Sequence, residues 1–382
     1  MSDAPLSGIR VLELARVLAG PWSGQVLADL GADVIKVESP GGDDTRRWGP
    51  PFIDNPDGTQ DAAYFHATNR GKRSVVIDFS TAEGAAEVKR LASEADVLIE
   101  NFKVGGLAKY GLDYSSLAES CPRLIYCSIT GFGQDGPYAN RPGYDFIIQG
   151  MSGIMDLTGD PAGEPQKIGV AFADIFTGLY ATIAIQAALW HRERTGQGQH
   201  IDMALLDCMV GVLANQGLNF LASSEPPGRL GNRHPNIAPY ETFPTVDGWF
   251  ILAVGNNAQF QRFCSLVGLD ALPENDRFSS NAARIENREA LSQEITTATK
   301  RWKRDDLLAG LEEQSVPAGP INTVAEAFAD PQVQAREMQL AMKRNGDGVT
   351  IPGIRSPIRF SESPEGECEP SPQLGKNKPE WK

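Results

Sequence analysis

The sequence lacks the short motifs that mark many metal, redox and hydrolytic sites. It has five cysteines in 382 residues, and no two form a C-x-x-C pair, so neither a zinc site nor a disulfide framework is indicated. No P-loop, G-x-S-x-G or H-E-x-x-H motif is present, and no G-x-G-x-x-G follows the first expected strand. The four histidines do not cluster in sequence. Nothing here indicates a metal, and the nicotinamide fingerprint is missing.

Long apolar runs and excess positive charge are also missing. No stretch of 18 apolar residues occurs, and Met1–Leu6 lacks the basic and apolar regions of a signal peptide, so we expect no membrane span. None of the five cysteines, of which Cys368 is the last in the chain, is part of a disulfide pattern. Four of them lie in apolar or structured segments and are expected to be small core residues, which fits a reducing cytoplasm. The net charge of −14 argues against nucleic acid and anionic membranes as partners. It leaves room for an anionic small ligand, because local basic clusters can oppose the global charge.

What is present is a regular alternation of short apolar runs and helical patterns. The first strand, a helix and the second strand form a β-α-β unit with the crossover length that a parallel sheet needs. Repetition of this unit predicts an α/β fold, a Rossmann-like doubly wound parallel sheet. The expected strands are residues 8–14, 34–38, 74–78, 97–100, 124–129 and 199–203, and the expected helices are residues 20–30, 81–94, 174–193 and 204–221.

The chain is long enough for two or three domains. Residues 223–239 are rich in Pro, Gly, Asn and Arg, which is typical of a linker. A smaller α+β region follows, and the stretch after residue 347 is rich in Pro and Gly and is expected to lie extended over another surface. We predict a large domain of residues 1–222 with 320–382, and a small α+β domain of residues 223–319 with its linkers.

Basic residues recur near the ends of the expected strands. Arg16 follows the first strand, Arg46 and Arg47 follow the second, and Asn101-Phe-Lys103 follows the fourth. Ligands of open α/β sheets bind beyond the carboxyl ends of the strands, and cations collected there suit a phosphorylated ligand such as a nucleotide or coenzyme A. A solvated basic rim is the alternative for any one of these residues.

One carboxylate stands within an apolar segment, Gly169–Tyr180. The neighbours of Asp174 include Phe172, Ile175 and Phe176, which would strip water from it. A desolvated carboxylate is paired, protonated or poised as a nucleophile. The alternative is an ordinary helix N-cap, because an Ala-rich apolar run follows.

Segments spread over nearly the whole chain resemble those of the class III CoA-transferases, the CaiB/BaiF family, and occur in family order. The resemblance implies transfer of coenzyme A between an acyl-CoA and a free carboxylic acid, with Asp174 as the nucleophile. It rests on Leu6-Ser-Gly8-Ile-Arg-Val-Leu12-Glu-Leu, Ala19-Gly20-Pro21, Leu27–Glu38, Asn69-Arg-Gly-Lys72-Arg73-Ser74, Glu100-Asn101-Phe102, Pro142-Gly143-Tyr144-Asp145, Gly169–Tyr180 and Thr195-Gly196-Gln-Gly198-Gln199.

The resemblance also implies the chemistry. The Asp174 carboxylate attacks the donor thioester, and the thiolate of CoA then converts the mixed anhydride to an aspartyl-CoA thioester, so that covalent catalysis divides one difficult step into easier ones. Backbone N–H groups near the start of the helix are expected to stabilise the oxyanion. No tightly bound cofactor is implied, since CoA is a substrate. The residues expected at the CoA are Arg16, Val17, Leu18, Ile77, Asn101, Phe102, Lys109, Tyr144 and Leu205, with Lys72, Arg73 and Arg141 as further phosphate or carboxylate contacts.

Two departures separate this chain from other activities of the same family. The family's α-methylacyl-CoA racemases have a histidine where this chain has Tyr144, and a glutamate where it has Asn257. Tyrosine is a poor general base near neutral pH because its ordinary pKa is about 10. Both departures favour transfer, with racemisation as the alternative and a CoA-binding protein without turnover as a second one.

The formyl-CoA:oxalate transferases of the family carry a run of glycines in a loop over the active site, which residues 228–236 lack. Arg229, Arg233 and His234 stand there instead and are candidates to meet the carboxylate of a longer acid. We therefore expect a succinyl-CoA-like donor and a dicarboxylate acceptor. The family resemblance further implies a homodimer of interlocked chains.

Overall fold

The computed structural model describes residues 4–366 and 369–382, so Cys368 lies outside the described residues. The chain divides into two compact units, which we describe separately. The predicted limits at 222 and 320 stay a prediction, because compactness alone does not show that a part folds by itself. The first unit comprises Met1–Met155, Lys167–Pro226 and Pro331–Lys382, and the second comprises Asp156–Gln166 and Pro227–Asp330.

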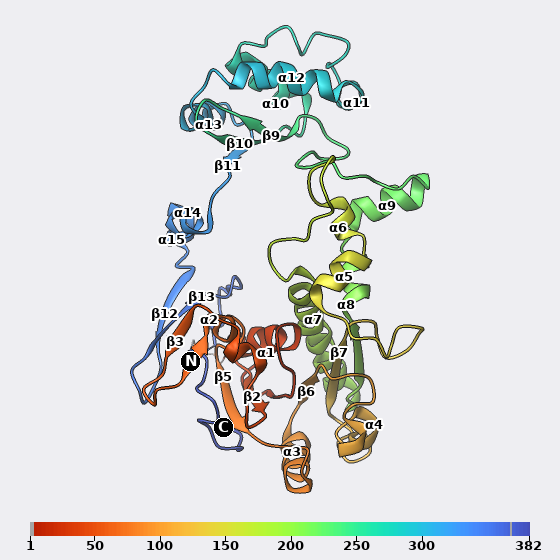
Figure 1. Ribbon diagram of the computed structural model, residues 1–382, viewed down its shortest axis with the longest axis vertical. Coiled ribbons are helices and arrows are strands. Elements are labelled where there is room, and N and C mark those ends of the chain that lie inside the picture. Colours follow the sequence, from red (N-terminus) through yellow and green to blue (C-terminus); the bar gives the residue numbers. More distant parts are fainter. Residues whose placement is uncertain (1–3, 367–368) are drawn as a thin grey trace. The chain divides into compact units, whose positions relative to one another are not determined.

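A six-stranded, fully parallel sheet forms the centre of the first unit (Figure 1). Its strand order, β5-β2-β1-β6-β7-β8, runs outward from β1 in both directions, as in a doubly wound fold. The predicted fold class is therefore confirmed. The strands are β1 (Arg10–Glu13), β2 (Asp33–Glu38), β5 (Lys72–Val76), β6 (Val97–Glu100), β7 (Ile125–Thr130) and β8 (His200–Ala204).

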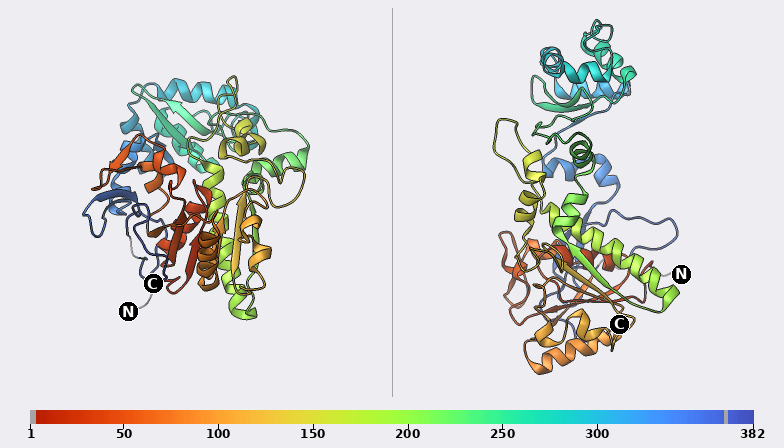
Figure 2. Two further views of the ribbon diagram at one scale, coloured as in Figure 1. Left: turned by 60° about the horizontal axis from the view of Figure 1, so that its bottom comes forward. Right: turned by 90° about the vertical axis from the view of Figure 1, so that its right-hand side faces the viewer.

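Helices cover both faces of this sheet because its buried side chains alternate along each strand. Val11 of β1 belongs to the core shared with α1 and α7, whereas its neighbour Leu12 belongs to the core shared with α3. The right-hand view of Figure 2 shows the long helix α7 in yellow-green running beside the sheet. The main helices of the unit are α1 (Ala19–Asp29), α3 (Ala82–Glu94), α5 (Asp145–Met151), α7 (Phe172–Thr195), α8 (Leu205–Gly211) and α9 (Ala214–Ser223).

Short elements complete the first unit. The stretch after β13 lies extended, and its residue Asn377 exchanges hydrogen bonds with Ser74 at the edge strand β5, as the Pro- and Gly-rich composition indicated. The short elements are the turns η1 (Asp44–Arg47) and η2 (Ala108–Tyr110), the hairpins β3 (Phe52–Asp54) with β4 (Gln60–Ala62) and β12 (Gln339–Lys343) with β13 (Thr350–Ile354), and the helices α2 (Ala63–His66), α4 (Tyr114–Leu117) and α15 (Pro331–Ala335), while α6 (Ile154–Leu157) crosses the division between the units.

The second unit has a three-stranded antiparallel sheet with helices around its own apolar core. The core includes the large side chains Phe243, Phe250, Phe260 and Phe263, all of which are buried. Its elements are β9 (Tyr240–Pro244), β10 (Trp249–Ala253), β11 (Ala318–Pro320), α10 (Asn257–Val267), α11 (Asn281–Glu286), α12 (Arg288–Thr299), α13 (Arg304–Glu313) and α14 (Val324–Ala329).

The expected single helix over residues 204–221 was wrong, because α8 and α9 are separate helices that meet at a bend of 74°. Ala214, the first residue of α9, has a positive φ of 47°, which ends the helical path of α8. Among the described residues, α7 is the one helix long and apolar enough to cross a membrane, and α8 with α9 passes the same test only as a broken span. Ala173, Ala181 and Ile185 of α7 are buried in the core, which is equally typical of a core helix. The absence of a membrane partner and the cytoplasmic location stay predictions.

Candidate active site

The loops that follow β1 and β6 meet where the strand order reverses. From β1, successive strands go one way through β2 to β5 and the other way from β6 to β8, which makes the β1–β6 boundary the crevice where open α/β sheets bind ligands. Asn101, just after β6, accepts a hydrogen bond from the backbone N–H of Arg16 at 3.0 Å and donates one to its carbonyl at 2.6 Å. Two residues expected from sequence at the CoA are thus joined at this crevice.

Rings and cations form a continuous surface beside that junction. Phe102 packs edge-on against Phe79 at 5.7 Å between ring centroids, and Phe79 packs likewise against Tyr110 at 5.6 Å. The guanidinium of Arg16 lies 5.5 Å from the Phe102 ring, and the ammonium of Lys109 lies 4.7 Å from the Tyr110 ring. Both cations are exposed to solvent. A surface of this kind suits a purine ring and its phosphates.

Asp174 lies in the first turn of α7, where that helix approaches α1 closely. One turn further along α7, a Cβ added to Gly178 would come within 2.7 Å of the carbonyl oxygen of Ala19, the first residue of α1. Only glycine allows this approach, which explains why the two helix starts lie side by side. Because α1 follows directly on the Arg16 loop, the same contact brings Asp174 towards the crevice.

A second carboxylate, Asp145, caps α7 from outside. One of its carboxylate oxygens, Oδ1, accepts hydrogen bonds from the backbone N–H groups of Ala173 at 2.8 Å and Asp174 at 3.3 Å. Its Oδ2 accepts from the side-chain amide of Gln149 at 2.7 Å. The alternative in which Asp174 is the cap therefore fails, because the cap comes from α5 and Asp174 is itself within the helix.

The same hydrogen bonds correct the expected source of oxyanion stabilisation. The N–H groups of Phe172 and Ile175 donate to the carbonyls of Val170 and Ala171. With Asp145 taking the two N–H groups between them, the whole first turn of α7 is occupied. These groups are not free to bind an oxyanion, so the donors for that role must come from elsewhere.

Asp174 keeps its carboxylate without a counter-charge. Burial, and to a lesser degree the negative charge of Asp145, raises the pKa of Asp174 to about 7. Within the part of the chain that the structure describes, no cation forms an ion pair with this carboxylate. A weakly solvated, unpaired carboxylate is a stronger nucleophile than a hydrated one and is a candidate catalytic group.

Lys72 and Arg73, expected as phosphate contacts, have other partners. The ammonium of Lys72 is buried and donates to Glu13, the Pro21 carbonyl and Asn69 within 3.0 Å. The guanidinium of Arg73 pairs with both carboxylate oxygens of Asp33. Both residues begin β5 at the amino ends of the strands, but the Lys72 ammonium reaches Glu13, the last residue of β1, and Pro21 in the first turn of α1, where it is buried and paired. We therefore remove both from the set of CoA contacts.

The remaining expected residues fall into an open group and a covered group. Arg141 and Tyr144 are exposed just before α5, and the Arg141 guanidinium lies 4.5 Å from the Tyr138 ring. Val17 is half-buried in the loop after β1. The covered ones are Leu18, just before α1, Ile77, just after β5, and Leu205, which begins α8 in the same core cluster as Ala173.

The arginines expected to meet a carboxylic acid substrate are paired within the second unit. Arg229 forms an ion pair with Asp156 at 3.0 Å. Arg233 pairs with Glu241 at 3.1 Å and also with Glu289. Within that unit, both guanidinium groups therefore stabilise the loop that carries them rather than standing open.

Three residues of this site were missed by the sequence analysis as functional groups. Asp145 has a detectable signal, namely an acidic residue four positions before Gln149, which places both side chains on one face of α5. Phe79 completes the ring surface, and Asp43 contacts the loop after β1, but a single Phe or Asp in a loop carries no such spacing signal.

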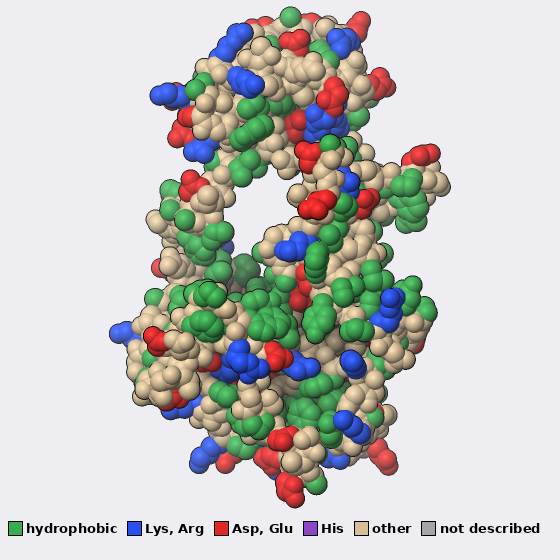
Figure 3. All heavy atoms as spheres, in the orientation of Figure 1, with side chains coloured by type: hydrophobic (Ala, Val, Ile, Leu, Met, Phe, Trp, Pro, Cys, Tyr) green, Lys and Arg blue, Asp and Glu red, His purple; other side chains and the backbone are tan. Residues whose placement is uncertain are grey.

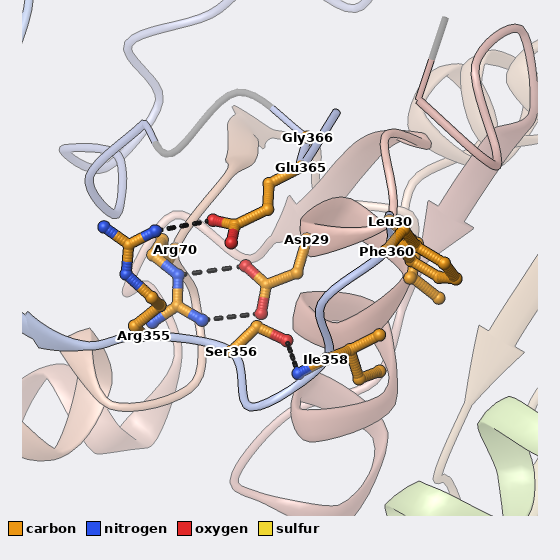
Figure 4. Close-up of a pocket in the computed structure, with 9 residues that line it drawn as sticks. All are labelled: Asp29, Leu30, Arg70, Arg355, Ser356, Ile358, Phe360, Glu365 and Gly366. Carbon is orange, nitrogen blue, oxygen red and sulfur yellow. Dashed lines mark hydrogen bonds and ion pairs between the residues drawn. The ribbon is translucent and has the colours of Figure 1, made fainter. Parts of the chain in front are cut away.

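A small cavity at the opposite edge of the sheet is filled with paired charges (Figure 4). Its volume is about 20 Å³. Arg70 makes two hydrogen bonds to Asp29 at 2.6 and 3.0 Å, and Arg355 pairs with Glu365 at 2.8 Å. Because every charge there already has a partner, the cavity offers little to a ligand. Its paired side chains instead tie the C-terminal stretch to the sheet. Among the described residues, no group of three or more His, Cys, Asp or Glu could hold a metal.

Comparison with known proteins agrees with this geometry. The chain is 60% identical over 375 residues to the succinate–glutarate CoA-transferase of Agrobacterium fabrum, covering 98% of this chain and 94% of that one. It is 40% identical over 375 residues to the human succinyl-CoA:glutarate CoA-transferase, covering 98% and 84% of the two chains. It is 38% identical over 364 residues to the succinyl-CoA:mesaconate CoA-transferase of Haloarcula hispanica, covering 94% and 90%.

Solved structures show the same fold. A CaiB/BaiF family protein from Brucella suis superposes with a TM-score of 0.88 at 63% identity, covering 98% of this chain and 97% of that one. Rv3272 from Mycobacterium tuberculosis, also solved as an aspartate-to-alanine mutant, gives a TM-score of 0.86 at 32% identity and 98% coverage of both chains. Residues 6–378 match the family described as CoA-transferase family III, and the chain belongs to this family of CoA-transferases.

Proposed function

We propose that this enzyme transfers CoA from succinyl-CoA to a dicarboxylic acid of the size of glutarate, with Asp174 as the nucleophile. The unpaired carboxylate of Asp174, at the start of α7 beside the Arg16–Asn101 junction, carries the proposal. The relatives named for succinyl-CoA and for glutarate or mesaconate support the choice of donor and acceptor.

In this mechanism the Asp174 carboxylate attacks the thioester carbonyl of succinyl-CoA and releases the CoA thiolate, leaving a succinyl–aspartyl anhydride. The thiolate attacks the aspartyl carbonyl of that anhydride, which forms aspartyl-CoA and releases succinate. The acceptor carboxylate then attacks aspartyl-CoA, and the thiolate released in that step attacks the acceptor's carbonyl in the new anhydride. The products are the new acyl-CoA and free Asp174, so no water or redox partner is consumed.

The rings and cations at the strand ends fit the two ends of the proposed CoA site. The adenine would pack on the surface of Phe79, Phe102 and Tyr110, and its phosphates would meet Arg16 and Lys109. The thioester end would lie at Asp174. Low solvation at that end favours attack by the carboxylate over hydrolysis of the anhydride.

Mass spectrometry of the enzyme after incubation with succinyl-CoA tests the proposal. We expect the peptide that contains Asp174 to gain the mass of CoA less one water, and hydroxylamine to remove the adduct. Asp174→Asn should give no adduct, whereas Asp156→Asn, an exposed aspartate of the second unit, should leave it unchanged. An adduct on another peptide, or unchanged turnover in Asp174→Asn, would refute the assignment.

We also propose that the enzyme works as a homodimer, with chains interlocked as the family resemblance implies. Large apolar side chains are exposed on α5, α7 and α9, and Figure 3 shows patches of hydrophobic atoms on the face of the first unit that it draws. Ile183 and Trp190 of α7 are 62% and 67% exposed, and Leu221 of α9 is 74% exposed. Apolar surface on this scale supports an interface.

Light scattering during gel filtration tests the dimer. We expect a mass of two 41.3 kDa chains at micromolar concentration, and no exchange between tagged and untagged chains unless they are first unfolded together. Trp190→Ser should weaken the dimer, whereas Val246→Ser, at an equally exposed apolar position in the second unit, should not. A stable single chain would reject the proposal.

A further inference from the structure

The loop between β1 and α1 is held by three side chains from other elements. The ammonium of Lys36 donates to the Ala15 carbonyl at 2.8 Å. Asn101 holds both backbone groups of Arg16, and the backbone N–H of Val17 donates to Asp43 at 3.2 Å. Three consecutive residues of the loop are therefore held by side chains, in addition to the backbone hydrogen bond from Ala15 to Ile99 of β6.

Val17 is the residue of this loop that most needs such support. Its φ is +70°, in the left-handed region, where a β-branched residue is strained. A strained residue persists only where its surroundings over-determine it, and such residues cluster at functional sites. The hydrogen bond from the Val17 N–H to Asp43 is one contact that holds this conformation.

Asp43 supplies that acceptor, and its carboxylate is itself held in place by neighbouring groups. Its carboxylate accepts from the N–H and hydroxyl of Thr45 and forms an ion pair with Lys36 at 2.9 Å. The three ammonium protons of Lys36 are matched by Ala15, Asp43 and Glu13 within 3.0 Å, and the whole group is buried. Burial opposes both charges, but their mutual attraction outweighs it, which keeps the pKa of Asp43 low and that of Lys36 high.

We propose that Asp43, fixed by Lys36, is a positioning residue for coenzyme A. It holds Val17 in the left-handed conformation and thereby sets the direction in which the exposed, flanking Arg16 faces the ligand. Asp43 itself does not touch CoA in this scheme. The inference rests on the proposed function insofar as Arg16 contacts CoA.

The chain offers a matched control for Asp43. Asp57 makes the same local turn, because its carboxylate accepts from the N–H of Thr59 at 3.0 Å and from its hydroxyl at 2.7 Å. The corresponding distances at Asp43 are 3.0 and 2.8 Å. Asp57 is exposed, and among the described residues its carboxylate bonds to Thr59 and Gln373 rather than to the Arg16 loop, so Asp57→Asn makes the same substitution in a turn of the same kind without the proposed positioning.

Steady-state kinetics of Asp43→Asn and Asp57→Asn test the inference. For Asp43→Asn we expect the KM for succinyl-CoA to rise about tenfold, the size of effect that release of one strained residue allows, with kcat and the KM for glutarate within about threefold of the parent. Asp57→Asn should change none of these values. Equal effects of the two variants, or a loss of kcat with an unchanged KM, would overturn the inference.

Repeating the Asp43 substitution in a Val17→Gly variant distinguishes the positioning of Val17 from a general disruption of the loop. Glycine adopts positive φ without strain, so in Val17→Gly the further change Asp43→Asn should raise the KM for succinyl-CoA by no more than about threefold. An undiminished effect in that background would contradict the role of Val17. If Asp43→Asn does not fold, Asp43→Ser keeps a good N-cap residue while being too short to reach Val17, and the same outcomes apply.

Calorimetry with free CoA distinguishes failure of this inference from failure of the proposed function. If the parent enzyme forms no Asp174 adduct but Asp43→Asn still weakens CoA binding about tenfold, the positioning role stands and the mechanism falls. If the adduct forms normally and both Asp variants bind CoA equally well, the mechanism stands and the positioning role falls.

Discussion

The amino ends of the strands of the six-stranded sheet hold paired charges, whereas the carboxyl ends combine buried pairs, such as Lys36 with Asp43, with open charges. At the amino ends of the strands, Arg70 pairs with Asp29, and Arg73 pairs with Asp33, both at 2.6 Å and largely buried. At the carboxyl ends, the Lys109 and Arg141 side chains are exposed, and among the described residues neither forms an ion pair. Asp174, near the same edge, has no cation partner either.

The difference shows which charged side chains of this fold are available to a ligand. A guanidinium that already has a bidentate carboxylate loses much of its affinity for a phosphate, because the ligand would have to displace that partner. An open cation beside rings, or a carboxylate kept apart from cations, is held ready for something that is not part of the chain. Position relative to the strand ends and pairing state, taken together, separate structural charges from functional ones.

The strongest test of this comparison is Asp174→Asn. Losing the nucleophile should lower kcat at least roughly 10³-fold. Because the pKa of Asp174 is about 7 in the folded chain and 3.8 is its ordinary value, the folded state binds more protons between these values and loses stability as the pH rises through them. Asn removes this penalty, so urea unfolding at pH 8 should show a gain on the order of 2 kcal/mol, allowing for partial exposure. An Asp174→Asn variant that is less stable than the parent at pH 8 would contradict this prediction.

The pH dependence of kcat/KM gives the next largest effect. If the ionised Asp174 is the nucleophile, kcat/KM should fall about tenfold per pH unit below 7, and therefore about 100-fold at pH 5. Asp145→Asn removes the nearby negative charge while its amide oxygen can still cap α7, so the acidic limb should move to lower pH. A profile that is flat between pH 5 and pH 8 would refute this assignment of the pKa.

A smaller effect is expected for the open cations. Lys109→Gln should raise the KM for succinyl-CoA by roughly tenfold and leave kcat nearly unchanged, since it removes a charge that in the proposed complex contacts only the phosphates. The increase should shrink at high salt, where screening already weakens the contact. Arg73→Gln serves as the control because its partner is Asp33, and a similar increase in KM there would undo the distinction between the two edges.

Much of the fold was predictable from the sequence because it depends on local patterns. The alternation of apolar runs with helical segments predicted five of the six sheet strands within two residues at each end, and the strand at residues 97–100 without error. The break between α8 and α9 was missed because Ala214 is an ordinary helix former, and its positive φ comes from the packing around it rather than from its own preference.

The candidate site was predictable only in part. Asp174 stands out because a charge among aromatic side chains is visible in sequence. Lys72 and Arg73 directly precede the expected strand at residues 74–78, so their place at the amino ends of the strands was visible in sequence, but their pairing with Glu13 and Asp33 was not. The Asp145 cap and the contact of Asp43 with Val17 join residues 26 or more positions apart, which only the folded chain brings together.

The last prediction concerns the amino ends of the strands, where we expect substitutions of paired charges to leave catalysis unchanged. Asp29→Asn leaves the buried guanidinium of Arg70 without its carboxylate and should cost about 3 kcal/mol in the free energy of unfolding, measured with urea. Glu87→Gln, which removes the exposed ion pair with Arg90, should cost less than about 0.5 kcal/mol. Both folded variants should keep the parent's kcat and KM, because neither carboxylate lies at the ligand edge. A raised KM for succinyl-CoA in Asp29→Asn would mean that paired charges also serve the ligand, and that pairing state does not separate the two edges.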